Sequence, residues 1–186
     1  MRGFSLQNSL PRNYFFVGPS GIGKSTIVRE IARRRNDCKA VSLDDLTLKA
    51  GINLGLVPGD SRSAYDLLKS VGNDTFFMVG LTALYRMIGA RDSSRKLLVD
   101  IGAAFQNVTL LSTLSRFEMV ICLYASPEAS FERYASHRKS SRTYEKHVEI
   151  EFSGKRSIIY ESAEFCLDTS NMSLEETIRE TDKLIE

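Results

Sequence analysis

The stretch YFFVGPSGIGKST, which spans Tyr14–Thr26, is the most informative part of the sequence. Its first four residues are apolar and β-favouring, and they predict a short buried strand that ends at a glycine. Downstream, residues 25–35 carry apolar side chains at helical spacing. The glycine-rich turn is therefore flanked by a predicted strand on one side and a predicted helix on the other.

That turn, Gly18–Ser25, matches the P-loop pattern G-x-x-x-x-G-K-[ST]. Glycine permits the backbone angles that point several amide N–H groups at a bound phosphate. We expect Lys24 to reach the β- and γ-phosphates of a nucleoside triphosphate such as ATP, and the Ser25 hydroxyl to ligate Mg²⁺. A glycine-rich turn that binds no ligand is the alternative. The residues expected to contact the nucleotide are Gly18, Ser20, Gly21, Ile22, Gly23, Lys24, Ser25 and Thr26.

Short apolar segments alternate with amphipathic ones along the rest of the chain. This alternation predicts an α/β fold of the three-layer P-loop type, in which helices cover both faces of a five-stranded, mostly parallel sheet. The further expected strands occupy residues 40–43, 96–100, 119–124 and 165–167. Expected helices occupy residues 25–35, 65–71, 76–88, 108–114, 127–136, 158–164 and 174–185, and residues 51–63 are expected to form a loop.

Length and composition favour one soluble domain, because the chain has 186 residues of which 42% are hydrophobic and 26% charged. A net charge of +2 gives no argument for a nucleic-acid partner. No apolar run approaches the ~18 residues that cross a membrane, and the N-terminus lacks the apolar stretch of a signal peptide. The cysteines show no close pairing, and Cys122 and Cys166 lie in apolar runs where we expect burial. We expect a cytoplasmic protein without a membrane partner, and its oligomeric state stays open.

Acidic residues follow two of the predicted strands, at Asp44–Asp45 and at Asp100. Ligands of parallel sheets bind beyond the carboxyl ends of the strands, so these residues should meet the P-loop at one edge. Asp100 fits a carboxylate that holds Mg²⁺ through its water shell, or it caps a loop. One carboxylate of the Asp44–Asp45 pair could orient the hydroxyl of an acceptor and take its proton, or could cap the following helix.

The polar segment 137–157 differs from the rest of the chain, because six Lys or Arg residues lie between positions 137 and 156. We interpret it as a lid that brings an arginine, Arg138 or Arg142, to a transferring phosphate. A solvated charged loop is the alternative. His137 and His147 have no partners at metal-ligand spacing, so we expect both at the surface.

In its P-loop near the N-terminus and in the segments Val41–Asp44, Ile101–Ala104 and Arg156–Tyr160, the chain resembles shikimate kinase and its small-molecule kinase relatives, including gluconate kinase. The Gly18–Thr26 loop lies near the N-terminus, as in that family. Val41–Asp44 is similar to its second-strand acidic motif, and Ile101–Ala104 to its triple-glycine loop. Arg156–Tyr160, ahead of Phe165–Thr169, is similar to its Arg-x-x-x-Tyr segment.

The resemblance implies a kinase that transfers the γ-phosphoryl group of Mg·ATP to a hydroxyl of a small molecule. It assigns catalytic roles to Lys24 and to the lid arginine, Arg138 or Arg142. Asp44 would bind the acceptor and serve as a base, and Gly102 would bring its backbone close to the acceptor. Arg133 would pack against the adenine ring, and Arg156 would contact the acceptor. Ser25 and Asp100 would be the Mg²⁺ ligands.

Three departures from the family affect the acceptor side. Ser42 replaces the first acidic residue after the second strand, Phe76–Phe77 stand near the place of a substrate-binding arginine, and Ala103–Ala104 replace two glycines. These changes predict an acceptor other than shikimate. The apolar patch at 76–78 suggests a less charged acceptor, or it is part of the core. A nucleotide-binding regulatory protein without acceptor chemistry, or a kinase for a larger acceptor, are the alternative functions.

Overall fold

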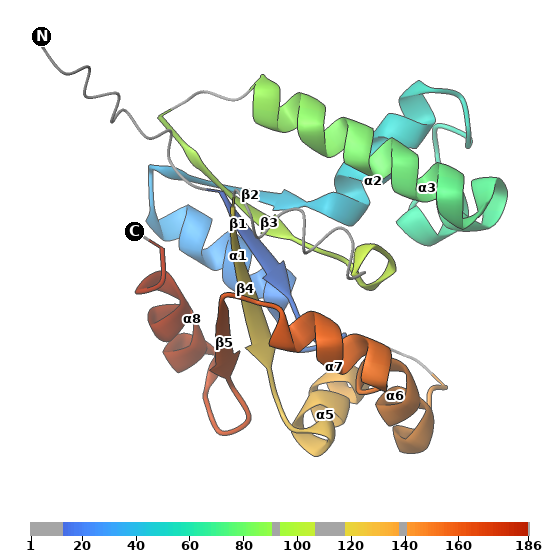
Figure 1. The fold of residues 1–186 in the computed structure, drawn as a ribbon. Helices are drawn as coiled ribbons and strands as arrows, with labels where there is room; N and C mark the ends of the chain where they lie inside the picture. The colour runs from blue at the N-terminus through green and yellow to red at the C-terminus, as the bar shows by residue number, and fades with distance from the viewer. Residues whose placement is uncertain (1–12, 91–93, 107–117, 138–140, 186) are drawn as a thin grey trace, which may run out of the picture.

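The computed structural model describes residues 13–90, 94–106, 118–137 and 141–185. Its sheet has the strand order β2-β3-β1-β4-β5, and every pair of neighbouring strands is parallel. The strands are β1 (Tyr14–Val17), β2 (Cys38–Ser42), β3 (Lys96–Asp100), β4 (Met119–Tyr124) and β5 (Phe165–Asp168). The predicted five-stranded parallel α/β fold is confirmed (Figure 1).

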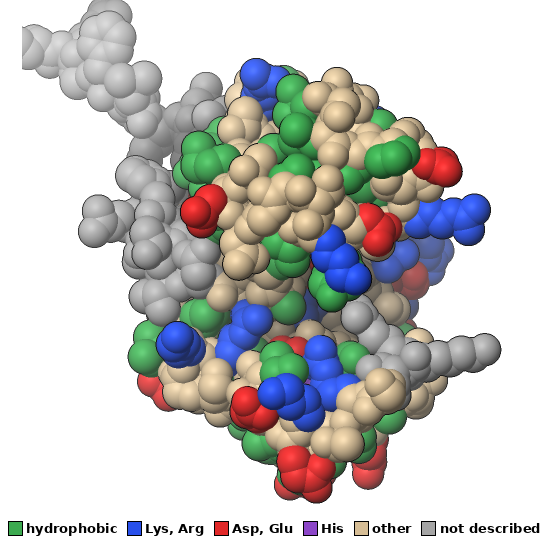
Figure 2. All heavy atoms as spheres, turned by 90° about the vertical axis from the view of Figure 1, so that its right-hand side faces the viewer, with side chains coloured by type: hydrophobic (Ala, Val, Ile, Leu, Met, Phe, Trp, Pro, Cys, Tyr) green, Lys and Arg blue, Asp and Glu red, His purple; other side chains and the backbone are tan. Residues whose placement is uncertain are grey.

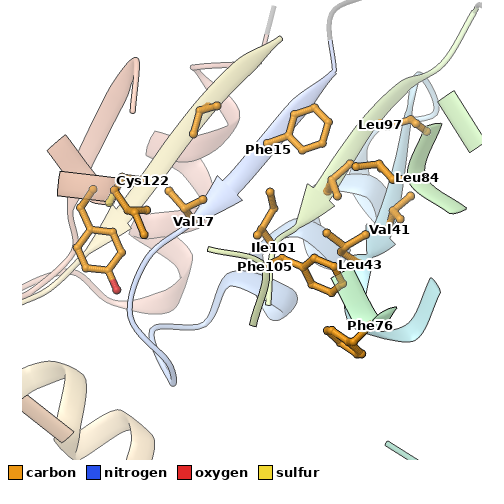
Figure 3. Packing of buried hydrophobic residues seen from close by; sticks show 14 of the residues in the cluster. Phe15, Val17, Val41, Leu43, Phe76, Leu84, Leu97, Ile101, Phe105 and Cys122 are labelled. Atoms are coloured by element: carbon orange, nitrogen blue, oxygen red, sulfur yellow. The ribbon is translucent and has the colours of Figure 1, made fainter. Parts of the chain in front are cut away.

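Helices cover both faces of this sheet, because successive residues of each strand point to opposite faces. Tyr14 and Phe16 pack with α1 (Lys24–Arg34) and α8 (Leu174–Asp182) on one face. Phe15 and Val17 pack on the other face, where α2 (Leu43–Asn53), α3 (Ala64–Gly89) and α7 (Gly154–Glu161) contribute buried side chains. Figure 3 shows this second cluster, to which α3 contributes Leu84 and Phe76, with Phe76 next to Phe105 beyond the ends of the strands.

The helix α3 is bent at Gly72, whose φ of 76° and ψ of 172° are not helical. Glycine adopts such a positive φ without the clash that a Cβ would cause. The bend separates the two helices predicted at 65–71 and 76–88. The predicted loop over 51–63 begins later than expected, because α2 continues to Asn53.

The proposed lid region contains helices, so the alternative of a solvated loop is wrong for its described part. After α5 (Pro127–His137), the helix α6 (Tyr144–Glu151) begins at the N-cap Thr143, whose side chain accepts a hydrogen bond from the Lys146 amide. The helix predicted over 108–114 and the lid residue Arg138 lie outside the described residues. No helix in the described parts of the chain is long and apolar enough to cross a membrane.

Two predictions about burial are wrong. His147 is fully buried, because the rings of Phe131 and Tyr134 from α5 pack against it and its Nε2 lies 3.0 Å from the Ser130 hydroxyl. Cys166 is exposed, because β5 is the edge strand of the sheet and carries little cover.

Candidate active site

A cavity of about 540 Å³ lies at the carboxyl edge of the sheet. The register pairs Asp100 at the end of β3 with both Phe16 of β1 and Ser42 of β2, so the segments that follow these strands start side by side. Lys24, Asp44 and Asp100 all border the cavity. Figure 2 looks onto this side of the molecule, where Lys and Arg side chains gather along a hollow between its upper and lower halves.

The P-loop depends on its glycines for steric reasons. Gly18, Gly21 and Gly23 have φ angles of 137°, 86° and 101°, which L-residues with a side chain rarely adopt. A Cβ at Gly18 would lie 2.0 Å from the Leu123 carbonyl oxygen, and one at Gly21 would lie 2.7 Å from the Cα of Tyr134. The helix α1 begins directly after this loop, so its N-terminal amides face the cavity edge where an anion can bind.

The Lys24 side chain is buried at the centre of the P-loop. Its Nζ donates to the carbonyl oxygens of Gly18 and Pro19, each at 2.9 Å. Burial lowers the pKa of Lys24, while the nearby carboxylates of Asp100 and Glu151 act in the opposite direction. The ammonium is therefore held over the loop by carbonyl contacts that a phosphate oxygen can replace.

Ser25 and Asp100 form a pair of oxygen donors at the same edge. The Ser25 hydroxyl donates to Oδ2 of Asp100, and Oδ1 of Asp100 is buried without a hydrogen-bond partner among the described residues. Buried polar atoms normally have partners, so this oxygen has unused capacity to accept. Mg²⁺ prefers oxygen ligands and uses one or two carboxylates together with substrate phosphates, so the donor set fits this ion. The described residues hold no cluster of three His, Cys, Asp or Glu side chains that could hold a metal ion.

The Asp44 carboxylate lies against the backbone of Gly102. A Cβ at position 102 would lie 2.2 Å from Oδ1 of Asp44, so only glycine leaves room for the carboxylate there. The expectation that Asp44 or Asp45 caps α2 is wrong, because the cap is Ser42, whose side chain accepts from the Asp45 amide at 3.2 Å. Asp44 lies in the first turn of α2 and borders the cavity.

Three of the candidate arginines, Arg133, Arg142 and Arg156, are among the described residues, and none of the three borders the main cavity. Arg133 donates to the hydroxyl and carbonyl of Thr169 and borders a second cavity of about 280 Å³, next to Gly21–Gly23 of the P-loop. Arg156 donates to carbonyl oxygens of Ala103 and Gln106 and does not border the main cavity. Arg142 lies 4.6 Å from the Tyr134 ring centroid, outside both cavities.

Two residues that the sequence reasoning missed contact the P-loop. Glu151, at the end of α6, is 1% exposed and accepts a hydrogen bond from the Ser20 amide at 3.2 Å. Its other oxygen pairs with Arg142 at 3.1 Å. Gln106 is buried, and its Nε2 donates to the Gly18 carbonyl at 3.1 Å. Neither residue belongs to a motif, and nothing in its local sequence signals a contact with a loop so distant along the chain.

The Glu151 carboxylate occupies a P-loop amide that a phosphate oxygen could use. Burial raises the pKa of Glu151, but the hydrogen bond from Ser20 and the positive charges of Arg156 and Lys24 outweigh this, so its pKa lies below the usual value. The carboxylate is therefore ionised at neutral pH. An anionic side chain at the end of α6 thus occupies a P-loop amide in this structure.

Comparisons with known proteins agree with this geometry. No family model and no curated protein sequence matches the chain. Solved structures do: shikimate kinase from Bacteroides thetaiotaomicron has a TM-score of 0.70 and 15% identity, over 93% of this chain and 97% of that one. Shikimate kinase from Acinetobacter baumannii, in complex with shikimate, has a TM-score of 0.65 and 18% identity, and the match covers 95% of this chain and 93% of that one. Shikimate kinase from Aquifex aeolicus has a TM-score of 0.65 and 16% identity, and the match covers 91% of this chain and 93% of that one. The chain therefore has the P-loop fold of the shikimate kinases, at a sequence identity of 15–18% to these three structures.

Proposed function

We propose that this protein is a kinase that transfers the γ-phosphoryl group of Mg·ATP to a hydroxyl of a small molecule. The observation that carries the proposal is the shared cavity of the P-loop and the Asp44 carboxylate, which lies against Gly102. A carboxylate beside the P-loop cavity is the group that an acceptor hydroxyl needs for its orientation and for the removal of its proton. The fold shared with shikimate kinases supports the same reaction class.

In the proposed reaction, the acceptor oxygen attacks the γ-phosphorus as the bond to the β–γ bridging oxygen breaks and ADP leaves. Asp44 orients the acceptor hydroxyl and takes its proton. Lys24 exchanges the carbonyls of Gly18 and Pro19 for phosphate oxygens and offsets the charge that develops on them. Ser25 and Asp100 would hold Mg²⁺, which when bound neutralises phosphate charge.

For the nucleoside, we propose the second cavity, which Arg133 borders together with Met172 and Thr177. The contacts of Arg133 with the carbonyl oxygens of Thr169 and Met172 fix its planar guanidinium beside this cavity. A fixed guanidinium plane is well suited to stack on adenine.

The remaining roles follow the same scheme. We propose one P-loop domain over residues 1–186, with a lid over 137–157 that supplies Arg138 to the transferring phosphate. Arg156 would act by holding the Ala103 backbone next to Gly102. A cytoplasmic location is part of the proposal, since free thiols such as Cys166 persist in a reducing compartment.

A nucleotide-controlled regulatory protein and a kinase for a larger acceptor are the competing functions. The test is to incubate the protein with Mg·ATP and a panel of small alcohols and to measure ADP formation. At least one alcohol should stimulate ADP formation, and Asp44→Asn should abolish the stimulation while ATP still binds. The matched control is Asp45→Asn, because Asp45 is exposed and one residue away. Nucleotide binding without stimulation by any alcohol would favour the regulatory function.

A further inference from the structure

The main cavity has two chemically different ends. At the phosphate end it is bordered by the cations Lys24 and Arg29, which come from α1. On the acceptor side, the first turns of α3 contribute Ala64, Tyr65 and Leu68. All three side chains are apolar or aromatic, so this end offers van der Waals contact and few hydrogen bonds.

Phe76 continues this apolar wall beyond the bend in α3. It borders the cavity although its side chain is only 2% exposed, and its ring centroid lies 4.9 Å from that of Phe105 (Figure 3). Phe77 also packs on Phe105, with a centroid distance of 5.9 Å. Because these rings are fixed by core packing, the wall keeps its apolar character when a ligand enters.

The described residues make the acceptor side negative in charge. Asp44 is the charged side chain that the described residues contribute next to the α3 wall. The guanidinium of Arg156 donates to Ala103 and Gln106 carbonyls, at 2.9 and 3.3 Å, and does not border the cavity. The Lys69 ammonium lies 4.4 Å from the Tyr65 ring centroid, and it is not among the described residues that line the cavity. A carboxylate on the acceptor would therefore face a like charge and an apolar wall, and both disfavour it.

We propose that the acceptor is an uncharged alcohol with an apolar face. This face packs on Tyr65, Leu68 and Phe76, while the hydroxyl reaches Asp44. The inference rests on the proposed function, because it names the substrate class of the same site. Tyr65 is then a specificity-determining residue, since it contributes wall surface and is itself exposed at the cavity mouth.

Pairs of an acid and its methyl ester, in which esterification removes the negative charge and adds one methyl group, provide the test. The first pair is shikimate and its methyl ester, and the second is trans-4-hydroxycyclohexanecarboxylate and its methyl ester. Dissociation constants are measured by calorimetry with Mg·ADP present, and ADP formation from ATP is measured separately. We expect each ester to bind at least tenfold more tightly than its acid.

A variant that adds a cation to the wall makes the test specific for this site. Tyr65→Arg should shift the preference toward the acid by at least fivefold. Tyr85→Arg is the matched control, because Tyr85 is similarly exposed on the same helix and does not line the cavity. Circular dichroism checks that both variants fold.

The outcomes separate this inference from the proposed function. Acids that bind as tightly as their esters, no binding of either ester, or an unchanged preference in Tyr65→Arg each overturn the inference. Esters that bind with the expected preference, while no alcohol of any charge is phosphorylated, support the inference about the cavity and refute the kinase function.

Discussion

The contact between Glu151 and the P-loop leads to a prediction for Glu151→Gln. The carboxylate accepts the Ser20 amide hydrogen at 3.2 Å, and the side chain is 1% exposed. In the proposed complex, the phosphates of ATP take over this amide, displace the carboxylate and approach its negative charge. Glutamine keeps the size of the side chain and an acceptor oxygen, and it removes the charge.

The magnitude follows from the difference between two kinds of hydrogen bond. A bond to a charged group contributes about 1.5–3 kcal/mol and a neutral one about 0.5–1.5 kcal/mol. ATP therefore displaces a contact that is about 1–2 kcal/mol weaker in Glu151→Gln. This corresponds to a roughly 5- to 30-fold lower Kd for ATP. Removal of the repulsion between the carboxylate and the phosphates acts in the same direction.

The variant also separates Arg142 from its charged partner, which lies 3.1 Å away. Breaking a buried ion pair costs about 3–5 kcal/mol, but the Arg142 side chain is 23% exposed, so we expect a loss of about 1–2 kcal/mol in the free energy of unfolding. The variant should thus bind ATP more tightly although it is less stable. A side chain with a purely structural role would weaken both properties.

The assay is calorimetric titration with a non-hydrolysable ATP analogue and Mg²⁺, alongside urea denaturation. Glu149→Gln is the control, because Glu149 lies on the same helix, is exposed and pairs with the exposed Lys146 at 2.8 Å. An unchanged or higher Kd in a folded Glu151→Gln protein would refute the reasoning that the carboxylate competes with phosphate.

Two further predictions concern Gly102 and His147. Gly102→Ala places a Cβ 2.2 Å from the Asp44 carboxylate, so acceptor-dependent turnover should fall about 100-fold with ATP affinity unchanged. The control is Gly59→Ala, where a Cβ meets nothing within 4 Å, and it should leave steady-state turnover unchanged. Equal losses of turnover in Gly102→Ala and Gly59→Ala would contradict the placement of the Asp44 carboxylate against Gly102. Burial lowers the pKa of His147, so the unfolded chain binds a proton near pH 6.5 that the folded protein does not. The free energy of unfolding should therefore decrease as pH falls from about 7 to 5, and less steeply in His147→Phe. Parallel pH profiles from urea denaturation would exclude this role of His147.

The sequence was sufficient where neighbouring residues determine the backbone. The glycines of the P-loop, the strand before it and the helix after it are specified by local steric preferences, so the motif and its context were recognisable together. The alternation of apolar and amphipathic segments likewise predicted the parallel sheet. The bend at Gly72 separated two helices that the apolar spacing had already distinguished.

The sequence was misleading where burial depends on the position of an element in the fold. Cys166 lies in an apolar run, but its strand forms the edge of the sheet and leaves it exposed. His147 lies in a polar segment, but its helix packs on α5 and buries it completely. A local pattern does not report which side of a segment another segment will cover.

The sequence by itself thus determined the P-loop, the five strands of the sheet and the acidic positions at the strand ends, because short-range sterics and periodicity encode them, whereas the helices α2 and α6 were not among the predicted elements. Only the tertiary structure showed that the Glu151 carboxylate accepts a hydrogen bond from the Ser20 amide. It alone also showed that the Arg156 guanidinium donates to the Ala103 and Gln106 carbonyls. It alone also decided that an apolar wall from α3 faces Asp44. These contacts join segments far apart in the chain, and their formation depends on how whole elements pack.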